Sequence, residues 1–439
     1  MIRLRFAPTP VGHLLVGHAR VALANALFAQ RHGGHVLLRL DDTDAAHCKP
    51  SFAEALVQDL QWLGIGWDAM IRQSERLALY TEAADRLKQA GRLYPCFESP
   101  EELRFKQEQR RKRGKPTIYD RAMLRLTPAQ RAAAEANGKR PHWRLRLSDR
   151  LLVWDDLVAG RREVKLQSVS DPVAIAADGT FLPAFASVVD DIETGITHVI
   201  RSEENAANAG VQLDLFDALR ARPPRFAHLP GLSDDVHRRL GRRVGSLTVR
   251  SLRADGVEPI ALATCLVAPA LEAAPESLAA LAAGFELPAG TGAQRFDTAR
   301  LLRLNRQILA TTDFASVAAR LPGGATETFW LAVRGEIDLL SEARGWWDVV
   351  SGTIVPPVMA GEQLLLRAAQ ETLPAEPWDR TVLTTWLAQL GDATGRHGQP
   401  LLAPLRLALT GEDSGPDLGA LLPLIGRTRA ANRLQIAAS

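Results

Sequence analysis

The first candidate for chemistry is the segment PTPVGHLLVGH at residues 8–18. Its prolines and glycines break regular structure and a helical repeat of apolar residues follows, so we expect a loop that leads into a helix N-terminus. Backbone N–H groups and the positive end of the helix dipole favour a phosphate there. Gly17 would let a nucleotide approach the backbone closely, and His18 could reach a ring or a phosphate. By itself, such a loop is also typical of a structural strand-to-helix turn.

A second candidate is the strongly basic run RFKQEQRRKRGK at Arg104–Lys115. Clustered arginines and lysines attract phosphate groups, and binding through them weakens as salt is added. A basic helical face is also often only a solvated surface, so the run predicts a nucleic-acid contact only in a supporting context. The residues that we select as candidate contacts are Arg110, Arg111, Lys112, Arg113 and Lys115.

The composition is that of a globular protein with room for several domains. Of 439 residues 46% are hydrophobic, and 53 basic against 50 acidic side chains leave a net charge of +3, too small an excess to indicate a nucleic-acid partner. Cys48, Cys96 and Cys265 form no C-x-x-C pair, which argues against a disulfide framework and favours a reducing cytosol. Without an apolar signal sequence or a run of 18 apolar residues, a cytoplasmic protein with no membrane span is expected.

The elements around the first loop predict a parallel sheet. Ile2–Ala7 alternates as a short strand does, apolar residues recur at helical spacing over Val16–Arg31, and His35–Leu40 is typical of a buried strand. A strand–helix–strand unit of this length implies a right-handed crossover between parallel strands. Ligands of such sheets bind beyond the carboxyl ends of the strands, where the loop at Pro8–Gly17 and the acidic turn at Asp41–Asp44 would lie.

Further along the chain, helical and mixed stretches alternate. Residues 51–90 are helical in pattern, and residues 101–150 are more polar, as expected of an insertion between two halves of a sheet. Phe185–Val189 and Thr197–Arg201 are the strand candidates of a second α/β stretch. From roughly residue 255 the chain is rich in alanine and leucine with a helical period, so only helical domains are expected there.

These candidates follow the order of the motifs of one enzyme family. The segment APTPVGHLLVGHAR at residues 7–20 resembles the first signature of class I aminoacyl-tRNA synthetases, most closely A-P-S-P-T-G-x-L-H-(I/V)-G-x-A-R of the glutamyl-tRNA synthetases. One match would be weak, but a series in order over nearly the whole chain is specific. The other matching segments are LDDTD at 40–44, QSER at 73–76 with Tyr80, YPCF at 94–97 and PEEL at 100–103, VVDD at 188–191, HVIR at 198–201, FAHLP at 226–230 and PLRLALTG at 404–411.

The resemblance implies an α/β fold, with a Rossmann-type parallel-sheet catalytic domain, an inserted α/β domain and all-helical C-terminal domains. The expected boundaries are 1–95 for the first half of the catalytic domain, 96–185 for an inserted acceptor-stem-binding domain, 186–255 for the second half with a KMSKS-like loop, 256–330 for a helical stem-contact domain and 331–439 for a helical anticodon-binding region.

The implied reaction joins glutamate to tRNA with ATP. Glutamate and ATP form glutamyl-adenylate, and the glutamyl group then passes to the 3′ end of the tRNA, with tRNA-Glu as the expected acceptor. Adenylate formation needs positioning and positive charge near the leaving pyrophosphate, and no covalent nucleophile. Mg²⁺ is implied as the companion of ATP, and a monomer is expected.

The resemblance also assigns site residues. Arg5 and Arg201 match the arginines that hold the side-chain carboxylate of glutamate, which a guanidinium meets in two-pronged fashion, although a pair of buried salt bridges is the alternative. Asp41 matches the acidic residue that meets the substrate ammonium group. The expected ATP-binding residues are Pro8, Thr9, Gly17, His18, Glu204 and Arg242, and the expected catalytic residues are His18, Arg239, Arg242 and Arg243.

Several positions depart from the family's motifs. They are Leu15 for a histidine, Asp41 for a glutamate, Pro183 for a tyrosine, and Arg239-Leu-Gly-Arg-Arg243, with Gly241 for a serine, where the family has K-(L/I)-S-K-R. Leucine cannot donate a hydrogen bond to a triphosphate, and losing one such donor costs roughly 100- to 1000-fold in rate. His13 or His18 could replace the missing imidazole.

The insertion also departs from the family, because zinc-containing members use several cysteines there. This chain keeps Cys96, with Glu98 and Met123 near where other ligands would fall. A single thiolate is not a zinc site, so we expect no structural zinc and no other metal site in the protein itself.

Three hypotheses stay open at this point. The chain could be an active glutamate–tRNA ligase of normal or reduced rate, a tRNA-binding pseudo-synthetase that makes no adenylate, or a ligase with a different amino acid or acceptor. The arginine pair favours the first, and Leu15 with Gly241 favours the second. Pyrophosphate exchange separates the first from the second, and acceptor profiling separates the first from the third.

Overall fold

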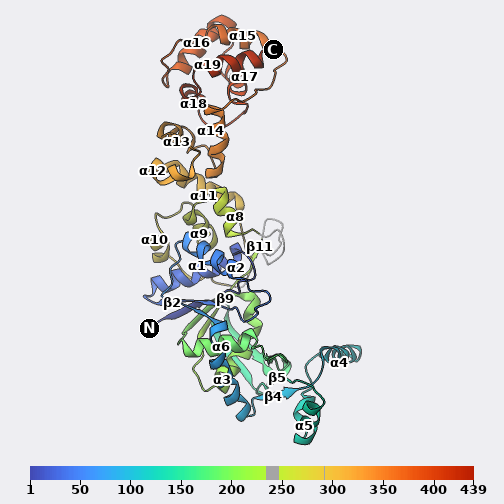
Figure 1. Cartoon of the computed structure of the whole chain (residues 1–439). Helices are drawn as coiled ribbons and strands as arrows, with labels where there is room; N and C mark the ends of the chain where they lie inside the picture. Colours follow the sequence, from blue (N-terminus) through green and yellow to red (C-terminus); the bar gives the residue numbers. More distant parts are fainter. Residues whose placement is uncertain (234–246, 291) are drawn as a thin grey trace. The chain divides into compact units, whose positions relative to one another are not determined.

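The computed structural model describes residues 1–233, 247–290 and 292–439. These residues form two compact units, and every described strand belongs to the first unit, whereas the second is helical (Figure 1). The first unit consists of Met1–Arg250, Leu266–Pro269 and Pro275–Asp297, and the second of Ser251–Cys265, Ala270–Ala274 and Thr298–Ser439.

Five parallel strands position the chemistry of the first unit. They are β1 (Arg3–Phe6), β2 (His35–Leu40), β3 (Ala69–Arg72), β9 (His198–Ser202) and β10 (Arg225–Leu229). β1, β2 and β3 pair in that order, and β9 pairs with β10. The β1–β2–β3 group and the β9–β10 pair adjoin at β1, because the backbone N–H of Thr197 donates to the carbonyl of Arg3 at 2.9 Å. The order in space is therefore β3-β2-β1-β9-β10.

The predicted strand–helix–strand unit at the N-terminus is confirmed. α1 spans Val16–Arg31 and connects β1 to β2, and its apolar positions are buried against the strands and against α10 (Leu278–Ala283). The helical pattern predicted for residues 51–90 is confirmed for α2 (Pro50–Trp62) and α3 (Leu77–Gln89), but β3 lies between these helices. β3 is four partly exposed residues long, and such a short segment carries too little periodicity to be recognised.

The prediction of a strand at Phe185–Val189 is wrong, because these residues lie in α6 (Pro183–Glu193). Pro183 occupies the first turn of the helix, where its missing N–H is not needed. Phe185, Val188 and Val189 are spaced to share one helical face and are buried. The second predicted strand, Thr197–Arg201, is confirmed as β9, and α7 (Ala209–Ala218) then leads to β10.

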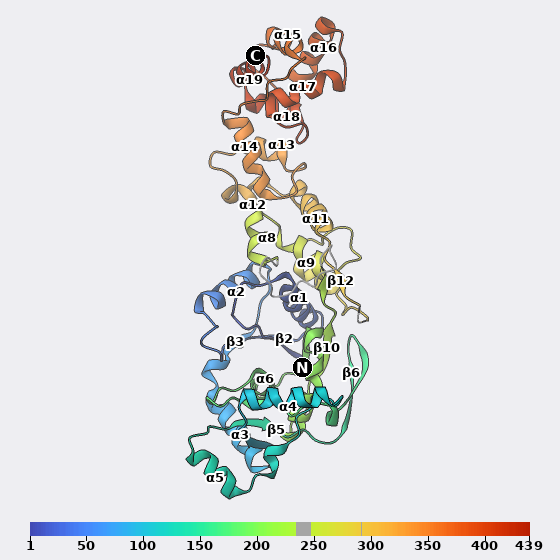
Figure 2. The same ribbon diagram turned by 90° about the vertical axis from the view of Figure 1, so that its right-hand side faces the viewer.

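Between β3 and β9 in the sequence, the chain forms an additional α/β segment. β4 (Leu93–Cys96), β5 (His142–Leu145) and β8 (Val173–Ile175) make an antiparallel sheet, and β6 (Leu151–Asp156) and β7 (Gly160–Lys165) make a hairpin. α4 (Pro100–Lys112) and α5 (Pro128–Ala136) lie at the periphery of the first unit (Figure 1 and Figure 2) and bury no residue fully.

The C-terminal part of the chain is helical, as predicted, apart from the short strand β12 (Gln294–Arg295), which pairs with β11 (Leu232–Ser233). The core of the second unit is built around the buried rings of Phe329, Trp330 and Trp386. The remaining helices are α8 (Val249–Asp255), α9 (Pro259–Val267), α11 (Thr298–Thr311), α12 (Phe314–Val317), α13 (Glu327–Val333), α14 (Ala343–Ser351), α15 (Gln363–Glu371), α16 (Val382–Thr394), α17 (Gln399–Thr410), α18 (Leu418–Ile425) and α19 (Arg427–Ala437).

Within the described ranges, none of the helices has the length and apolarity needed to cross a bilayer. The division into five domains stays a prediction.

Candidate functional site

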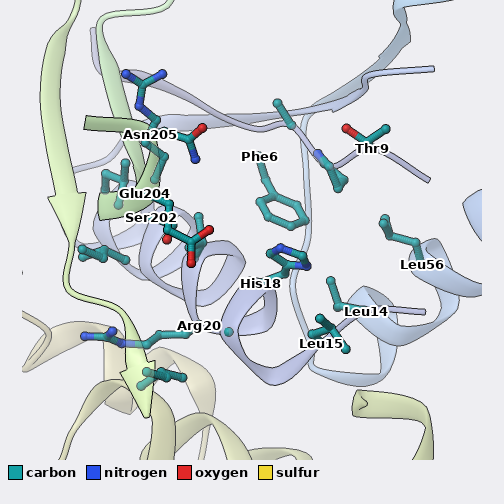
Figure 3. A pocket seen from close by; sticks show the side chains of 18 of the residues that line it. Phe6, Thr9, Leu14, Leu15, His18, Arg20, Leu56, Ser202, Glu204 and Asn205 are labelled. Carbon is teal, nitrogen blue, oxygen red and sulfur yellow. The ribbon is translucent and has the colours of Figure 1, made fainter. Parts of the chain in front are cut away.

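A cavity of about 900 Å³ opens in the first unit at the carboxyl ends of β1, β9 and β10 (Figure 3). The strand order changes direction between β1 and β9, and such a switch point is where parallel sheets bind ligands. The predicted site residues that line the cavity are Arg5, Pro8, Thr9, Gly17, His18, Arg201 and Glu204. Their roles in binding stay predictions.

One wall of the cavity is the start of α1. Leu15 is the N-cap residue, and it bridges to Thr248 through the backbone. The N–H of Val16 donates to the carbonyl of Leu247 at 3.2 Å, and the N–H of Val249 donates to that of Leu14 at 2.8 Å. The chain therefore returns to the α1 N-terminus directly after residues 234–246.

Part of the predicted site falls outside the described residues. Arg239, Gly241, Arg242 and Arg243 are among residues 234–246, so the structure does not place them. The flanking residues Leu232 and Thr248 both line the cavity.

The interior of the cavity contains an imidazole. Figure 3 shows the rings of His18 and Phe6 in the middle of the cavity, with Glu204 on one side and Leu15 on the other. His13 also lines the cavity, and its ring meets Phe52 edge-on with 5.5 Å between ring centroids. Two histidines thus stand close to the position where Leu15 replaces the family's histidine.

Arg201 brings a partly buried positive charge to the cavity wall. Its Nε donates to Nε2 of His228 at 3.0 Å, and its Nη1 donates to Oε1 of Gln212 at 2.7 Å. Nη2 is buried and has no hydrogen-bond partner, and no carboxylate of the described residues pairs with this guanidinium. Burial, together with the charge of Arg5, lowers the pKa of Arg201. An anionic ligand would offset both the burial of the charge on Arg201 and its repulsion by Arg5.

Arg5 supplies a second guanidinium from β1. The side chain is 6% exposed, and its Nε lies 3.3 Å from Oδ1 of Asp191. Burial and Arg39 lower the pKa of Arg5, while Asp191 opposes that change. The alternative of two buried salt bridges therefore holds for Arg5, which has a carboxylate partner, and not for Arg201.

Asp41 stands at the end of β2 but is not among the residues that line the cavity. Its carboxylate accepts hydrogen bonds from Arg39, with Nε–Oδ1 at 2.7 Å and Nη2–Oδ2 at 3.2 Å. Arg39 also donates to Asp191 at 2.9 Å, so Asp41 and Arg5 belong to one buried ionic network beneath the cavity. The role of Asp41 towards a substrate ammonium group stays a prediction.

Two of the matching motifs meet at Asp190 in α6. The buried carboxylate accepts from Nε2 of Gln73 at 2.8 Å, from Nε of Arg76 at 2.7 Å and from the hydroxyl of Tyr80 at 2.9 Å. Burial and Asp190 raise the pKa of Tyr80. These residues therefore connect the α3 region to α6, and none of them is among the residues that line the cavity.

The basic run covers the second half of α4 and the residues after it. Arg111, Lys112, Arg113 and Lys115 are exposed, whereas Arg110 is half-buried and donates to the carbonyl of Pro116 at 2.7 Å. Lys112 lies 3.3 Å from Glu108, which is an ordinary helical ion pair. The exposed side chains satisfy the geometric condition for a phosphate contact, and they also suit the negative end of the helix dipole.

Cys96 is surrounded by groups that satisfy one another. Its sulfur lies 3.6 Å from the hydroxyl of Tyr119, which donates to Glu98 at 2.5 Å, and Lys106 pairs with the same carboxylate. Burial raises the pKa of the Cys96 thiol to about 11. In the part of the chain that the structure describes, no three His, Cys, Asp or Glu side chains are placed to hold a metal ion.

The sequence patterns did not single out His228, Gln212 or Asn205. Asn205 lines the cavity, and His228 and Gln212 hold Arg201. His228 lay within the matched segment FAHLP, but no spacing rule connects it to Arg201.

Comparison with known protein families gives two matches. Residues 1–279 match the catalytic domain of tRNA synthetases class I (E and Q), and residues 360–438 match an anticodon binding domain.

Relatives with assigned names match along the whole chain. The protein "Glutamate--tRNA ligase 2" of Granulibacter bethesdensis is 54% identical over 99% of this chain and 98% of its own length. The protein of the same name from Acidiphilium cryptum is 55% identical over all of both chains. Among solved structures, a glutamate tRNA ligase from Elizabethkingia meningosepticum in complex with its amino acid superposes with a TM-score of 0.81 at 23% identity, covering 100% of this chain and 99% of that one.

Proposed function

This chain belongs to the class I tRNA synthetases of the E and Q group, and from that premise we propose that it is a glutamate–tRNA ligase. It joins glutamate to tRNA through glutamyl-adenylate formed with ATP. Relatives that carry this name match the chain from end to end, so both the catalytic and the anticodon-binding regions are accounted for.

The observation that carries the proposal is the state of Arg201. A partly buried guanidinium, with one nitrogen fully buried and no carboxylate partner among the described residues, is unfavourable unless a ligand supplies the negative charge. Arg5 adds a second guanidinium at the same cavity. A side-chain carboxylate of glutamate can accept two parallel N–H bonds from such a group, whereas the neutral amide of glutamine cannot match its charge.

ATP occupies the other end of the cavity in this proposal. The N-terminus of α1, Pro8, Thr9, Gly17 and His18 would face its phosphates. Mg²⁺ enters with ATP in this proposal and takes its ligands largely from phosphate oxygens and water.

The chemistry then needs two steps. An oxygen of the substrate α-carboxylate attacks the α-phosphorus, and the bond to the leaving pyrophosphate breaks. A hydroxyl at the 3′ end of the tRNA next attacks the activated carbonyl, and AMP leaves. Since charge builds on the pyrophosphate in the first step, fixed positive groups and alignment supply the catalysis. Arg239, Arg242 and Arg243 are proposed to contribute such charge.

For the finer points we propose tRNA-Glu as the acceptor, a monomer as the working form and the cytoplasm as its location. The basic side chains of α4 are proposed to contact tRNA phosphates. These points deepen the main proposal but do not carry it.

The deciding experiment is ATP–pyrophosphate exchange on the purified protein with tRNA present, followed by acceptor charging. Exchange should depend on glutamate and should not occur with glutamine or aspartate. Absence of exchange with all three amino acids, together with measurable tRNA binding, would refute the ligase and favour a tRNA-binding pseudo-synthetase. Exchange with charging of an acceptor other than tRNA-Glu would correct the acceptor alone.

A further inference from the structure

A buried carboxylate lies behind Arg201. Asp156 is at the end of β6, and its side chain is fully buried. Oδ1 accepts from the backbone N–H groups of Val158 and Ala159 at 3.0 Å and of His228 at 3.2 Å. Oδ2 lies 2.5 Å from Nδ1 of His228. Burial would raise the pKa of Asp156, but the hydrogen bonds from His228 and from the backbone lower it to about 2.

This arrangement determines which nitrogen of His228 carries the proton. An ionised carboxylate only accepts hydrogen bonds, so Nδ1 must be the donor. Burial lowers the pKa of His228, with Asp156 opposing and Arg201 reinforcing the change, so the ring stays neutral. Nε2 then keeps its lone pair and accepts the N–H of Arg201 Nε at 3.0 Å.

The order of hydrogen bonds fixes the plane of the Arg201 guanidinium. His228 holds Nε, and Gln212 holds Nη1, so Nη2 is the nitrogen left without a partner. β9 and β10 pair with Arg201 directly opposite His228, which places both side chains on the same face of the sheet. The ring of Phe226 covers the guanidinium at 5.1 Å from its centroid.

We propose that Asp156 and His228 are positioning residues for the glutamate pocket, and that they act by holding the Arg201 guanidinium in the orientation in which it binds the substrate side-chain carboxylate. This inference rests on the proposed function, because it assigns the geometry of the same pocket. Neither residue touches the substrate, and His228 acts through a fixed tautomer.

Two substitutions at His228 separate the two contacts of the ring. The amide of His228→Asn lies where Nδ1 was, so it can still donate to Asp156 but cannot reach Arg201. The longer side chain of His228→Gln brings an acceptor oxygen to the place of Nε2, so it can still accept from Arg201. Asp156→Asn keeps the shape of the carboxylate but can donate to Nδ1, which moves the ring proton to Nε2, against Arg201.

The test is the KM for glutamate and for ATP in tRNA-dependent pyrophosphate exchange. His228→Asn and Asp156→Asn should raise the KM for glutamate about 10- to 100-fold, as expected when a binding group is misplaced. The KM for ATP should stay within about twofold, and His228→Gln should recover part of the loss. An unchanged glutamate KM in His228→Asn, a parallel rise in both KM values, or a His228→Gln as impaired as His228→Asn would overturn the proposal.

A readout without catalysis separates this inference from the proposed function. ¹⁵N NMR of the histidine rings, with the His228 signal identified by its loss in His228→Asn, should report a proton on Nδ1 in the wild type and on Nε2 in Asp156→Asn. A proton on Nε2 of His228 in the wild type would overturn the proposed positioning of Arg201. A wild-type protein without glutamate exchange would refute the proposed function, while this signal would still decide the hydrogen-bond order.

Discussion

Arg201 and Arg5 have the same residue type and line the same cavity, yet their surroundings differ. Arg5 is paired with Asp191 within a buried ionic network, and Arg201 has only neutral partners. Keeping a partly buried guanidinium beside a second one is unfavourable without a counter-charge, as is expected of a site proposed to bind an anion. At the scale of single residues, the feature that distinguishes the candidate site is the lack of a carboxylate partner for Arg201 among the described residues.

Substituting Arg201 tests that interpretation directly. Arg201→Ala should lower kcat/KM for glutamate by about 30-fold or more, because removing one partner of a buried charge pair costs about 2 kcal/mol at least. Arg201→Lys should recover little, since a single ammonium group cannot replace the contacts of the guanidinium with His228 and Gln212 and also bind the substrate carboxylate. Steady-state exchange kinetics measure both. Arg222→Ala removes an exposed arginine nearby in the sequence and serves as the matched control. Wild-type kinetics in Arg201→Ala would rule out this role.

His228 also predicts how stability depends on pH. The groups that face its ring are Asp156, Arg201 and Arg162, and the pKa of His228 in the fold lies below its ordinary value of 6.5. The folded state thus binds a proton on His228 more weakly than the unfolded chain does. The contribution of neutral His228 to the free energy of unfolding is therefore complete above pH 6.5 and is lost as the pH falls through the folded pKa.

Thermal melting checks this expectation. Lowering the pH from about 7.5 to about 5.5 should reduce the melting temperature of the wild type more than that of His228→Asn, which has no ring to protonate. Equal reductions in the two proteins would contradict it.

At the scale of elements, short apolar segments are where the sequence pattern misleads. Phe185–Val189 has the composition of a strand but forms part of α6, since Pro183 starts a helix and the apolar side chains then fall on one face. The consequence matters for the site, because a helix here brings Asp190 and Asp191 to the arginines under the sheet. Those two neighbouring carboxylates serve Arg76 and Arg5, respectively, as well as Arg39.

The exposed end of α4 gives a prediction about tRNA. Replacing Arg111, Arg113 and Lys115 together by alanine should weaken tRNA binding, and the slope of log affinity against log salt should fall by about 0.7–0.9 for each phosphate contact that is lost. Binding titrations over a range of salt concentrations measure the slope. Arg86→Ala, which removes an exposed basic side chain from α3, should leave it unchanged. An unchanged slope in the triple variant would assign these residues to the solvated helix end.

At the scale of the whole molecule, the chain has two units with separate cores. Apolar clusters of the first unit gather around residues such as Tyr80, Phe185 and Phe226, and the second unit has its own cluster around Trp330 and Trp386. Units with their own cores are expected to unfold as separate cooperative transitions. The cavity belongs wholly to the first unit.

Calorimetry should therefore show two transitions that respond to different changes. ATP with Mg²⁺ should raise only the transition of the first unit, since a ligand stabilises the unit that binds it. Trp386→Ala should lower only the other transition, because removing a fully buried tryptophan costs roughly 3–5 kcal/mol. A single transition that both changes shift would show that the units unfold together.

The sequence by itself determined whatever depends on near neighbours. The βαβ unit at the N-terminus, the helical C-terminal part and the loop at Pro8–Gly17 follow from local periodicity and from proline and glycine, whose effects reach only a few residues. Ordered motifs then indicated the family and the candidate residues Arg5, His18 and Arg201, because chemistry restricts residue types at such positions.

Only the tertiary structure decided how these residues cooperate. Asp156 and His228 are 72 positions apart, and Arg5 and Asp191 are 186 apart, so no spacing rule joins them. They meet because elements that are distant in the chain pack together in the fold: β6 packs against β10, and α6 brings Asp191 to Arg5 of β1. The tertiary structure gives Arg5 a carboxylate partner and Arg201 only neutral ones. This difference makes Arg201 the candidate for binding the glutamate side chain.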